Sequence, residues 1–99
     1  MNPPSVEVMT LSATAAMLDM RRPFTRAFGR SRNGRQVGAA AWSAFHAALL
    51  HGCGIAAATS HAQVAARERN SRSWLVARWP EARIARVVMK AAEAAANAS

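Results

Sequence analysis

The chain has 99 residues and 52% of them are apolar, but 25 of the 51 apolar residues are alanine. Because an alanine side chain buries little more than one methyl group, at about 0.8 kcal/mol per carbon, the core is smaller than this percentage suggests. A chain this short forms one small domain at most, which argues against an enzyme with a cleft between two domains. With 13 basic residues against 5 acidic ones, the net charge of +8 favours a polyanionic partner.

The composition also favours helices over sheets. Alanine is the best helix former, whereas the chain offers a sheet only seven Val, two Ile and no Tyr. We therefore expect an all-α fold, a compact bundle of about five short helices. Residues 1–9 contain two prolines and no helical periodicity, so they are expected to form a flexible leader before a single domain over residues 10–97.

Two short helices are expected next in the chain. The first runs from Ser12 to Met20 and stops before Pro23, because proline disfavours the helical conformation in the residue that precedes it. Proline suits the first turn of a helix, so Pro23 opens a second helix, which ends at Phe28 and is closed by Gly29. A basic loop over residues 30–35 follows.

The central helix is expected from Gln36 or Val37 to His51, where Gly52 and Gly54 end it. Because the chain has few large side chains to fill its interior, Trp42 and also Trp79 are expected to pack in the core rather than stack on bases. The buried face of this helix is expected to contain Val37, Ala41, Phe45, Ala48 and Leu49.

The C-terminal half is expected to contain three further helices. Ser60 and Gln63 have the spacing of a capping box, which predicts a helix from His61 to about Arg69. A turn at residues 70–71 and a short helix over residues 72–79 follow. Pro80 then starts a last helix that runs to about Ala96 and turns one apolar face inward, made of Ile84, Val87, Val88, Ala91 and Ala95.

The basic residues fall into two blocks. Residues 21–35 carry six arginines and no acid, and residues 67–90 carry the other seven bases beside Glu68 and Glu81. Residues 36–66, between the blocks, carry no Lys, Arg, Asp or Glu. Two solvated faces around a buried hairpin would give this pattern, but the size of the net charge favours a two-part surface that binds phosphate.

The uncharged centre contains no sign of a membrane span or a metal site. It is rich in Ala and Gly, which insert poorly into a bilayer, and it is interrupted by histidines and by two glycines. His46, His51, Cys53 and His61 lie close in sequence, but their spacing matches no zinc site. We therefore predict no catalytic residue, no metal and no cofactor. The single cysteine excludes an internal disulfide and suits the cytoplasm.

Two segments have the residue types of a helix-turn-helix. In the first, from Leu11 to Phe28, a small residue, Ala15, lies in the first helix and Asp19 comes four places on. The polar stretch Arg21-Arg22-Pro23 then opens the second helix. This segment resembles the helix-turn-helix of small bacterial and phage transcriptional regulators, in which Leu18, Met20 and Phe28 would be the packing positions.

The second segment, from Gln63 to Trp79, is similar to the same family in two registers. With Ala65 as the small residue, Arg78 falls on a core position. With Ala66 instead, Asn70 takes the turn and Arg78 is free. The second register is physically easier, because asparagine tolerates the left-handed backbone conformation that such a turn requires.

The resemblance implies that a recognition helix enters the major groove while cations around it hold the phosphates. In the first segment the residues expected to read bases are Arg22, Thr25 and Arg26, with Arg21 beside them, and those expected to hold the backbone are Arg30, Arg32 and Arg35. In the second segment the expected base readers are Asn70, Arg72 and Ser73, with Arg67, Arg69 and Arg78 nearby. For each arginine taken alone, the alternative is a solvated side chain that lies along its helix.

We therefore predict a small protein that binds double-stranded DNA, a transcriptional regulator of the kind found on phages, plasmids or other mobile elements. A homodimer is expected, because one short recognition helix makes too few contacts for specificity. Two alternatives remain open. The basic face would dock on an acidic protein surface of a nucleic-acid-handling complex and inhibit or adapt it, or residues 21–35 would hold the protein at an anionic membrane surface.

Overall fold

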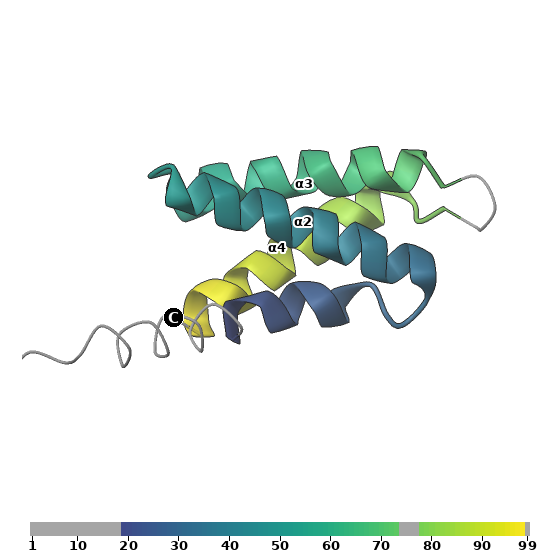
Figure 1. The fold of residues 1–99 in the computed structure, drawn as a ribbon, viewed down its shortest axis with the longest axis horizontal. Helices are drawn as coiled ribbons and strands as arrows, with labels where there is room; N and C mark the ends of the chain where they lie inside the picture. The colour runs from purple at the N-terminus through teal and green to yellow at the C-terminus, as the bar shows by residue number, and fades with distance from the viewer. Residues whose placement is uncertain (1–18, 74–77, 99) are drawn as a thin grey trace, which may run out of the picture.

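The structure, a computed structural model, describes residues 19–73 and 78–98 (Figure 1). Every regular element in these ranges is a helix, which confirms the predicted all-α class. The elements are a helical segment over residues 19–27, α2 (Arg32–Leu50), α3 (Ile55–Ser71) and α4 (Glu81–Ala98). The predicted leader and nearly all of the first predicted helix lie outside the described residues.

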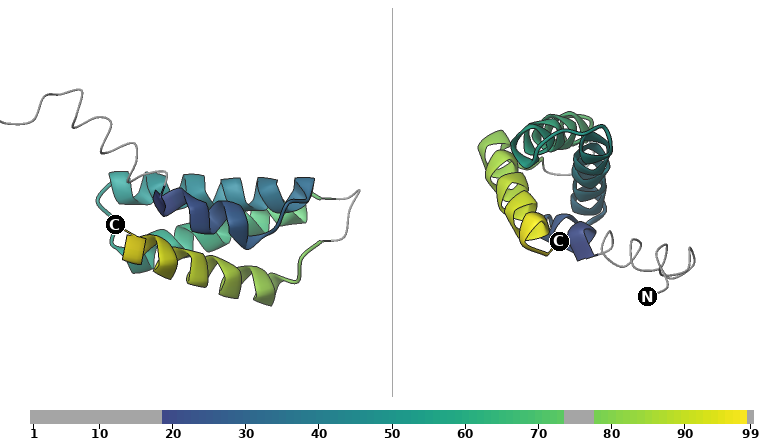
Figure 2. Two further views of the ribbon diagram at one scale, coloured as in Figure 1. Left: turned by 90° about the horizontal axis from the view of Figure 1, so that it is seen from below. Right: turned by 90° about the vertical axis from the view of Figure 1, so that its left-hand side faces the viewer.

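The helices pack as a four-cornered bundle, as the end-on view in Figure 2 shows. α2 and α3 form an antiparallel hairpin, and α4 returns along α3. The 19–27 segment completes the bundle between α2 and α4. None of the helices that the structure describes is both long enough and apolar enough to cross a membrane.

Large apolar side chains from three of these four elements fill the centre of the bundle. Phe24, on the 19–27 segment, packs against two rings of α2. Its ring centroid lies 5.0 Å from that of Phe45 and 5.8 Å from that of Trp42. α3 contributes alanines, because its buried apolar residues are Ala58, Ala62 and Ala66. The largest fully buried side chains are Phe24, Phe28, Val37, Phe45, Ile84 and Val88. The apolar faces predicted for the central and last helices are therefore confirmed.

The first part of the described chain departs from the prediction at Pro23. We expected one helix to end before Pro23 and another to begin there, but residues 19–27 form one helix that contains it. Proline has no N–H to donate to the carbonyl group of Asp19, and this single missing bond does not break the helix here. The first helix-turn-helix segment therefore has no turn at residues 21–23.

α2 begins at Arg32, so the prediction of a basic loop over residues 30–35 is wrong. Ser31 has an extended backbone and its Oγ accepts a hydrogen bond from the Gly34 N–H at 3.0 Å, which is an N-cap. Two glycines of α2, Gly34 and Gly38, lie where a side chain has no room. A Cβ on Gly38 would lie 2.5 Å from the carbonyl oxygen of Phe24, and one on Gly34 would overlap that of Phe28. The two glycines let the 19–27 segment approach α2 at backbone distance.

α3 begins at Ile55, six residues before the predicted start, and it continues to Ser71. Ser60 and Gln63 form no capping box. The Ser60 hydroxyl donates to the carbonyl of Ala56 in the preceding turn, and Gln63 Nε2 donates to the Ala85 carbonyl on α4 at 3.0 Å. Gln63 thus serves a contact between helices rather than a cap. The turn expected at residues 70–71 is part of α3.

The short helix predicted over residues 72–79 is wrong where the structure describes it. Arg72 is in a turn, and neither Ser73 nor residues 78–80 are helical. Residues 74–77, which include Trp74, lie outside the described residues. In the described part of the second helix-turn-helix segment, residues 63–71 belong to one long helix, and residues 72, 73, 78 and 79 are not helical. The predicted last helix corresponds closely to α4.

The close approach of α2 to the 19–27 segment predicts the sign of a Gly38→Ala substitution. In a helix interior this change normally stabilises by about 1 kcal/mol. Here the new Cβ meets backbone, which cannot rotate away, so we expect a net loss of about 1–3 kcal/mol in the free energy of unfolding. Urea unfolding followed by circular dichroism measures it. Gly54→Ser, at an open N-cap position, should change stability by only a few tenths of a kcal/mol in the favourable direction. A Gly38→Ala protein as stable as the wild type would contradict this packing.

Candidate nucleic-acid interface

Arginines from three separate stretches of the chain meet at one end of the bundle. This end contains the start of α2, the end of α3 and the start of α4, which lie together on the right of Figure 1. We call it the basic end and define it by Arg30, Arg32, Arg35, Arg69, Arg72, Arg78 and Arg83. Six of these seven residues are among the sites predicted from the sequence, and they come from both of the basic blocks. The fold thus brings together two blocks that the uncharged residues 36–66 separate in sequence.

Asn70 fastens the connection after α3 to the helix itself. Its side chain is only 4% exposed, its Nδ2 donates to the Trp79 carbonyl, and its Oδ1 accepts from the Trp79 N–H, both at 2.9 Å. The amide therefore pairs with both backbone polar groups of Trp79 and ties the end of α3 to the residue that lies just before α4. The expectation that Asn70 reads bases from a left-handed turn does not fit, because it is buried and helical and no described residue other than glycine has a positive φ.

Trp79 packs between an aromatic ring and a guanidinium group at this end. Its ring meets that of Phe28 edge to face, with the centroids 5.2 Å apart. The Arg83 guanidinium carbon lies 4.5 Å from the Trp79 ring centroid, which is a cation–π contact. Trp79 is partly buried against the core, as predicted, and Arg83 covers its exposed side. Trp42 is also buried, so both tryptophans that the structure describes have packing roles.

Polar contacts between α2 and the end of α3 hold three more residues in place. Ser73 donates its hydroxyl proton to Asn33 Oδ1, and its carbonyl accepts from Arg78 Nε at 2.6 Å. Arg69 is half-buried and donates from Nη2 to Gln36 Oε1. Ser73 is therefore engaged within the protein, which does not fit its predicted role as a base reader. Arg69 and Arg78 keep further N–H donors beyond the one that each uses here.

Four arginines of the basic end remain fully available. Their side chains are exposed and make no hydrogen bond or ion pair with any described residue: Arg30, Arg32, Arg35 and Arg72. Glu68 on α3 and Glu81 on α4 belong to elements that meet at this end, but neither forms an ion pair with these arginines. Four cations that share one end without acidic partners repel each other, and a bound polyanion would relieve this repulsion.

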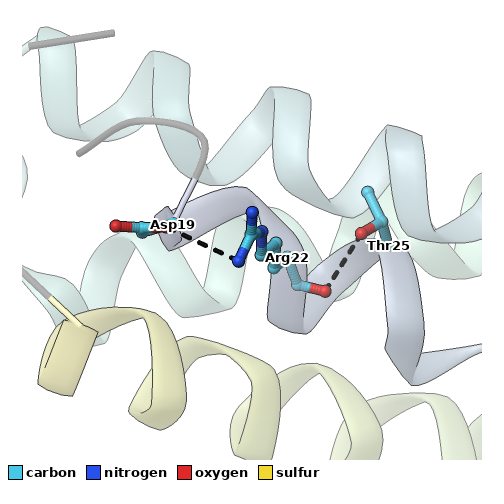
Figure 3. A network of polar contacts seen from close by, with 3 residues as sticks. All are labelled: Asp19, Arg22 and Thr25. Carbon is cyan, nitrogen blue, oxygen red and sulfur yellow. Dashed lines mark hydrogen bonds and ion pairs between the residues drawn. The ribbon is translucent and has the colours of Figure 1, made fainter. Parts of the chain in front are cut away.

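The remaining predicted residues lie along the bundle rather than at the basic end. Arg21, Arg22, Thr25 and Arg26 are on the exposed side of the 19–27 segment. Figure 3 shows that Arg22 faces Asp19, with 3.9 Å between the charged groups, and that Thr25 donates its hydroxyl proton to the Arg22 carbonyl at 3.0 Å. Thr25 is thereby satisfied within its own helix. Arg67 is exposed on α3, one turn before the basic end.

The sequence alone did not identify Arg83, Gln36 and Asn33 as parts of this end. Arg83 follows Trp79 by four residues, but Trp79 precedes α4, so helical spacing does not by itself place the guanidinium on the ring. No local pattern predicts the contacts of Gln36 and Asn33, because their partners are 33 and 40 residues away in the chain.

One groove lies away from the basic end. A shallow groove of about 320 Å³ lies between the 19–27 segment and α4, lined by Pro23, Ala27, Val87, Lys90, Ala91 and Ala94. Lys90 is its only polar side chain, so it lacks the converging polar groups of an active site. Over residues 19–73 and 78–98, no three His, Cys, Asp or Glu side chains are grouped as metal ligands.

Comparison with protein-family models, curated proteins and solved structures found no match to this chain. We therefore infer the function of the basic end from its own charge and geometry.

The clasp between Asn70 and Trp79 predicts a loss of stability on Asn70→Ala. The substitution leaves the Trp79 N–H and carbonyl without partners, so we expect the free energy of unfolding to fall by about 1–3 kcal/mol. Chemical denaturation measures this loss. Asn97→Ala is a matched control, because Asn97 is exposed near the end of α4 and the change should have little effect. Equal stabilities for the two variants would show that the clasp contributes nothing.

Proposed function

We propose that this protein binds double-stranded DNA and that the basic end rests against the phosphate backbone. The observation that carries the proposal is the convergence of four exposed, unpartnered arginines from the start of α2 and the end of α3. Arginine offers a planar fork of donors that matches two phosphate oxygens, and binding releases the counterions that the polyanion had condensed. A small chain with net charge +8 gains affinity from this release without any deep pocket.

Two features support the basic end over the 19–27 segment as the contact surface. At the basic end, Arg69, Arg78 and Arg83 are held by Gln36, Ser73 and Trp79, so part of the cost of ordering long side chains is already met in the free protein. On the 19–27 segment, by contrast, Asp19 partly neutralises Arg22. Three of the seven arginines at the basic end are thus ordered before DNA binds, which favours this end as the surface for a phosphate backbone.

The mode of binding follows from which side chains remain free. Of the residues expected to read bases in the second segment, Arg72 is exposed, whereas Asn70 is buried and Ser73 is engaged. One free arginine gives little discrimination between base pairs. We therefore propose binding directed at the backbone, with similar affinity for different sequences. Operator binding by a transcriptional regulator is the more specific form of this function, and it requires base readers beyond Arg72.

The proposal predicts the salt dependence of DNA binding. If the four free arginines each neutralise one phosphate, the logarithm of the association constant should fall with the logarithm of salt concentration with a slope of about −3.6. Fluorescence anisotropy on a short labelled duplex measures the slope, and duplexes of different base composition should give similar constants. Specificity ratios of about 1,000 or more would support an operator-binding regulator instead. Failure to bind at low salt would contradict the proposal and favour an acidic protein surface as the partner.

Substitutions at the basic end provide the sharper test. Arg32→Ala and Arg72→Ala, on two different elements, should each weaken binding about five- to tenfold and reduce the salt slope by about 0.9. Arg21→Ala is the matched control, because it removes the same charge from an exposed position at the far end of the 19–27 segment. It should change affinity less than about twofold, since salt screens charges beyond about 10 Å. Equal losses for all three variants would show a diffuse positive field rather than a defined site.

A further inference from the structure

Two large apolar side chains are exposed at the tip of the α2–α3 hairpin, opposite the basic end. Leu50 closes α2 and is 74% exposed, and Ile55 opens α3 and is 41% exposed. They flank the turn over residues 51–54, in which Gly52 has φ 86°. We define the hairpin tip as Leu50, Ile55 and the turn between them. Isolated exposed apolar residues are common, but two that flank one tight turn form a small apolar patch.

The hairpin tip itself contains no charged side chain. Residues 36–66 carry no Lys, Arg, Asp or Glu, although the whole chain has a net charge of +8. Figure 1 shows this tip and the basic end at opposite ends of the bundle. An anionic partner is attracted to the basic end and gains nothing from a neutral tip. The tip therefore suits a partner that is itself positively charged and is repelled by the arginines of the basic end.

A second copy of the chain is such a partner. Two molecules that each carry +8 repel one another in most orientations, and this repulsion is weakest when the uncharged tips meet. Contact there also covers Leu50 and Ile55, which the single chain leaves in water. In such a pair the two basic ends point away from each other.

We propose that the hairpin tip is a self-association surface through which two copies pack tip to tip. The patch is small, so the dimer is a weak and reversible one. The self-association does not depend on DNA binding. Only its consequence, a dimer with two outward basic ends that can hold two DNA segments, rests on the proposed function.

Sedimentation velocity of the protein without DNA, over a wide concentration range and at low and high salt, tests the proposal. We expect a monomer–dimer equilibrium that shifts toward dimer as salt screens the repulsion between copies. DNA binding weakens with salt, so the two processes are distinguished by opposite salt dependences. A protein that stays monomeric throughout, or that associates less as salt increases, overturns the self-association and leaves the DNA proposal untouched.

The double substitution Leu50→Gln with Ile55→Gln locates the surface. It removes the apolar groups at exposed positions and leaves the net charge unchanged, and it should raise the dimer dissociation constant at least about tenfold. Met89→Gln is the matched control, because Met89 is 46% exposed on α4, beside Lys90, and should leave the constant within about twofold of wild type. An equal effect of Met89→Gln overturns the assignment to the tip. Short-duplex affinity should be unchanged in both variants, and its loss would count against the DNA site instead.

Discussion

The structure depends on one close approach, that of α2 to the 19–27 segment. Gly34 and Gly38 lie one turn apart on α2, and the absent side chains leave room for the carbonyl groups of Phe28 and Phe24. This contact directs both phenylalanine rings into the centre of the bundle. It also fixes the short connection to α2, where Gly29 with φ 76° reverses the chain and Ser31 caps the helix. The arginines on either side of Ser31 are thereby held at the basic end.

Small side chains also explain how an alanine-rich chain forms a defined core. α3 presents only alanine and one asparagine as buried residues, so its neighbours can approach closely and share the few large side chains. Phe28 lies against the start of α2 and also meets Trp79, which precedes α4. One aromatic contact thus joins the residue after the 19–27 segment to the residues that lead into α4. Packing of apolar side chains between the helices therefore places the two basic blocks together.

Patterns with a local cause could be predicted from the sequence. The helical class followed from composition, and the buried faces of α2 and α4 followed from the spacing of residues such as Val37, Phe45 and Val88. Two predictions of helix ends and loops that rested on a single proline or glycine were wrong. Pro23 was expected at a helix boundary and Gly34 in a loop, but Pro23 lies within a helix and Gly34 allows a tertiary contact. Tertiary packing overrode local preference at both positions.

The sequence could predict which kind of residue forms the candidate site, but not which of these residues lie together. The two arginine blocks are visible in the sequence, yet only the fold shows that Arg32 and Arg72 share one end while Arg21 does not. Asn70 had the residue type of a base reader, and its actual role depends on a backbone partner nine residues away. A polar residue next to a charged cluster therefore needs a structure before it can be assigned to a ligand or to the protein.

The central claim is that the fold builds one binding surface from the two basic blocks. NMR titration of the labelled protein with a short DNA duplex, observing backbone amides and arginine Nε–Hε groups together, tests it most directly. The account predicts that shifts concentrate in residues 28–35, 69–73 and 78–83, with the hairpin tip and the outer side of the 19–27 segment unaffected. Shifts that follow the 19–27 segment and α4, or that spread evenly over all arginines, would contradict it.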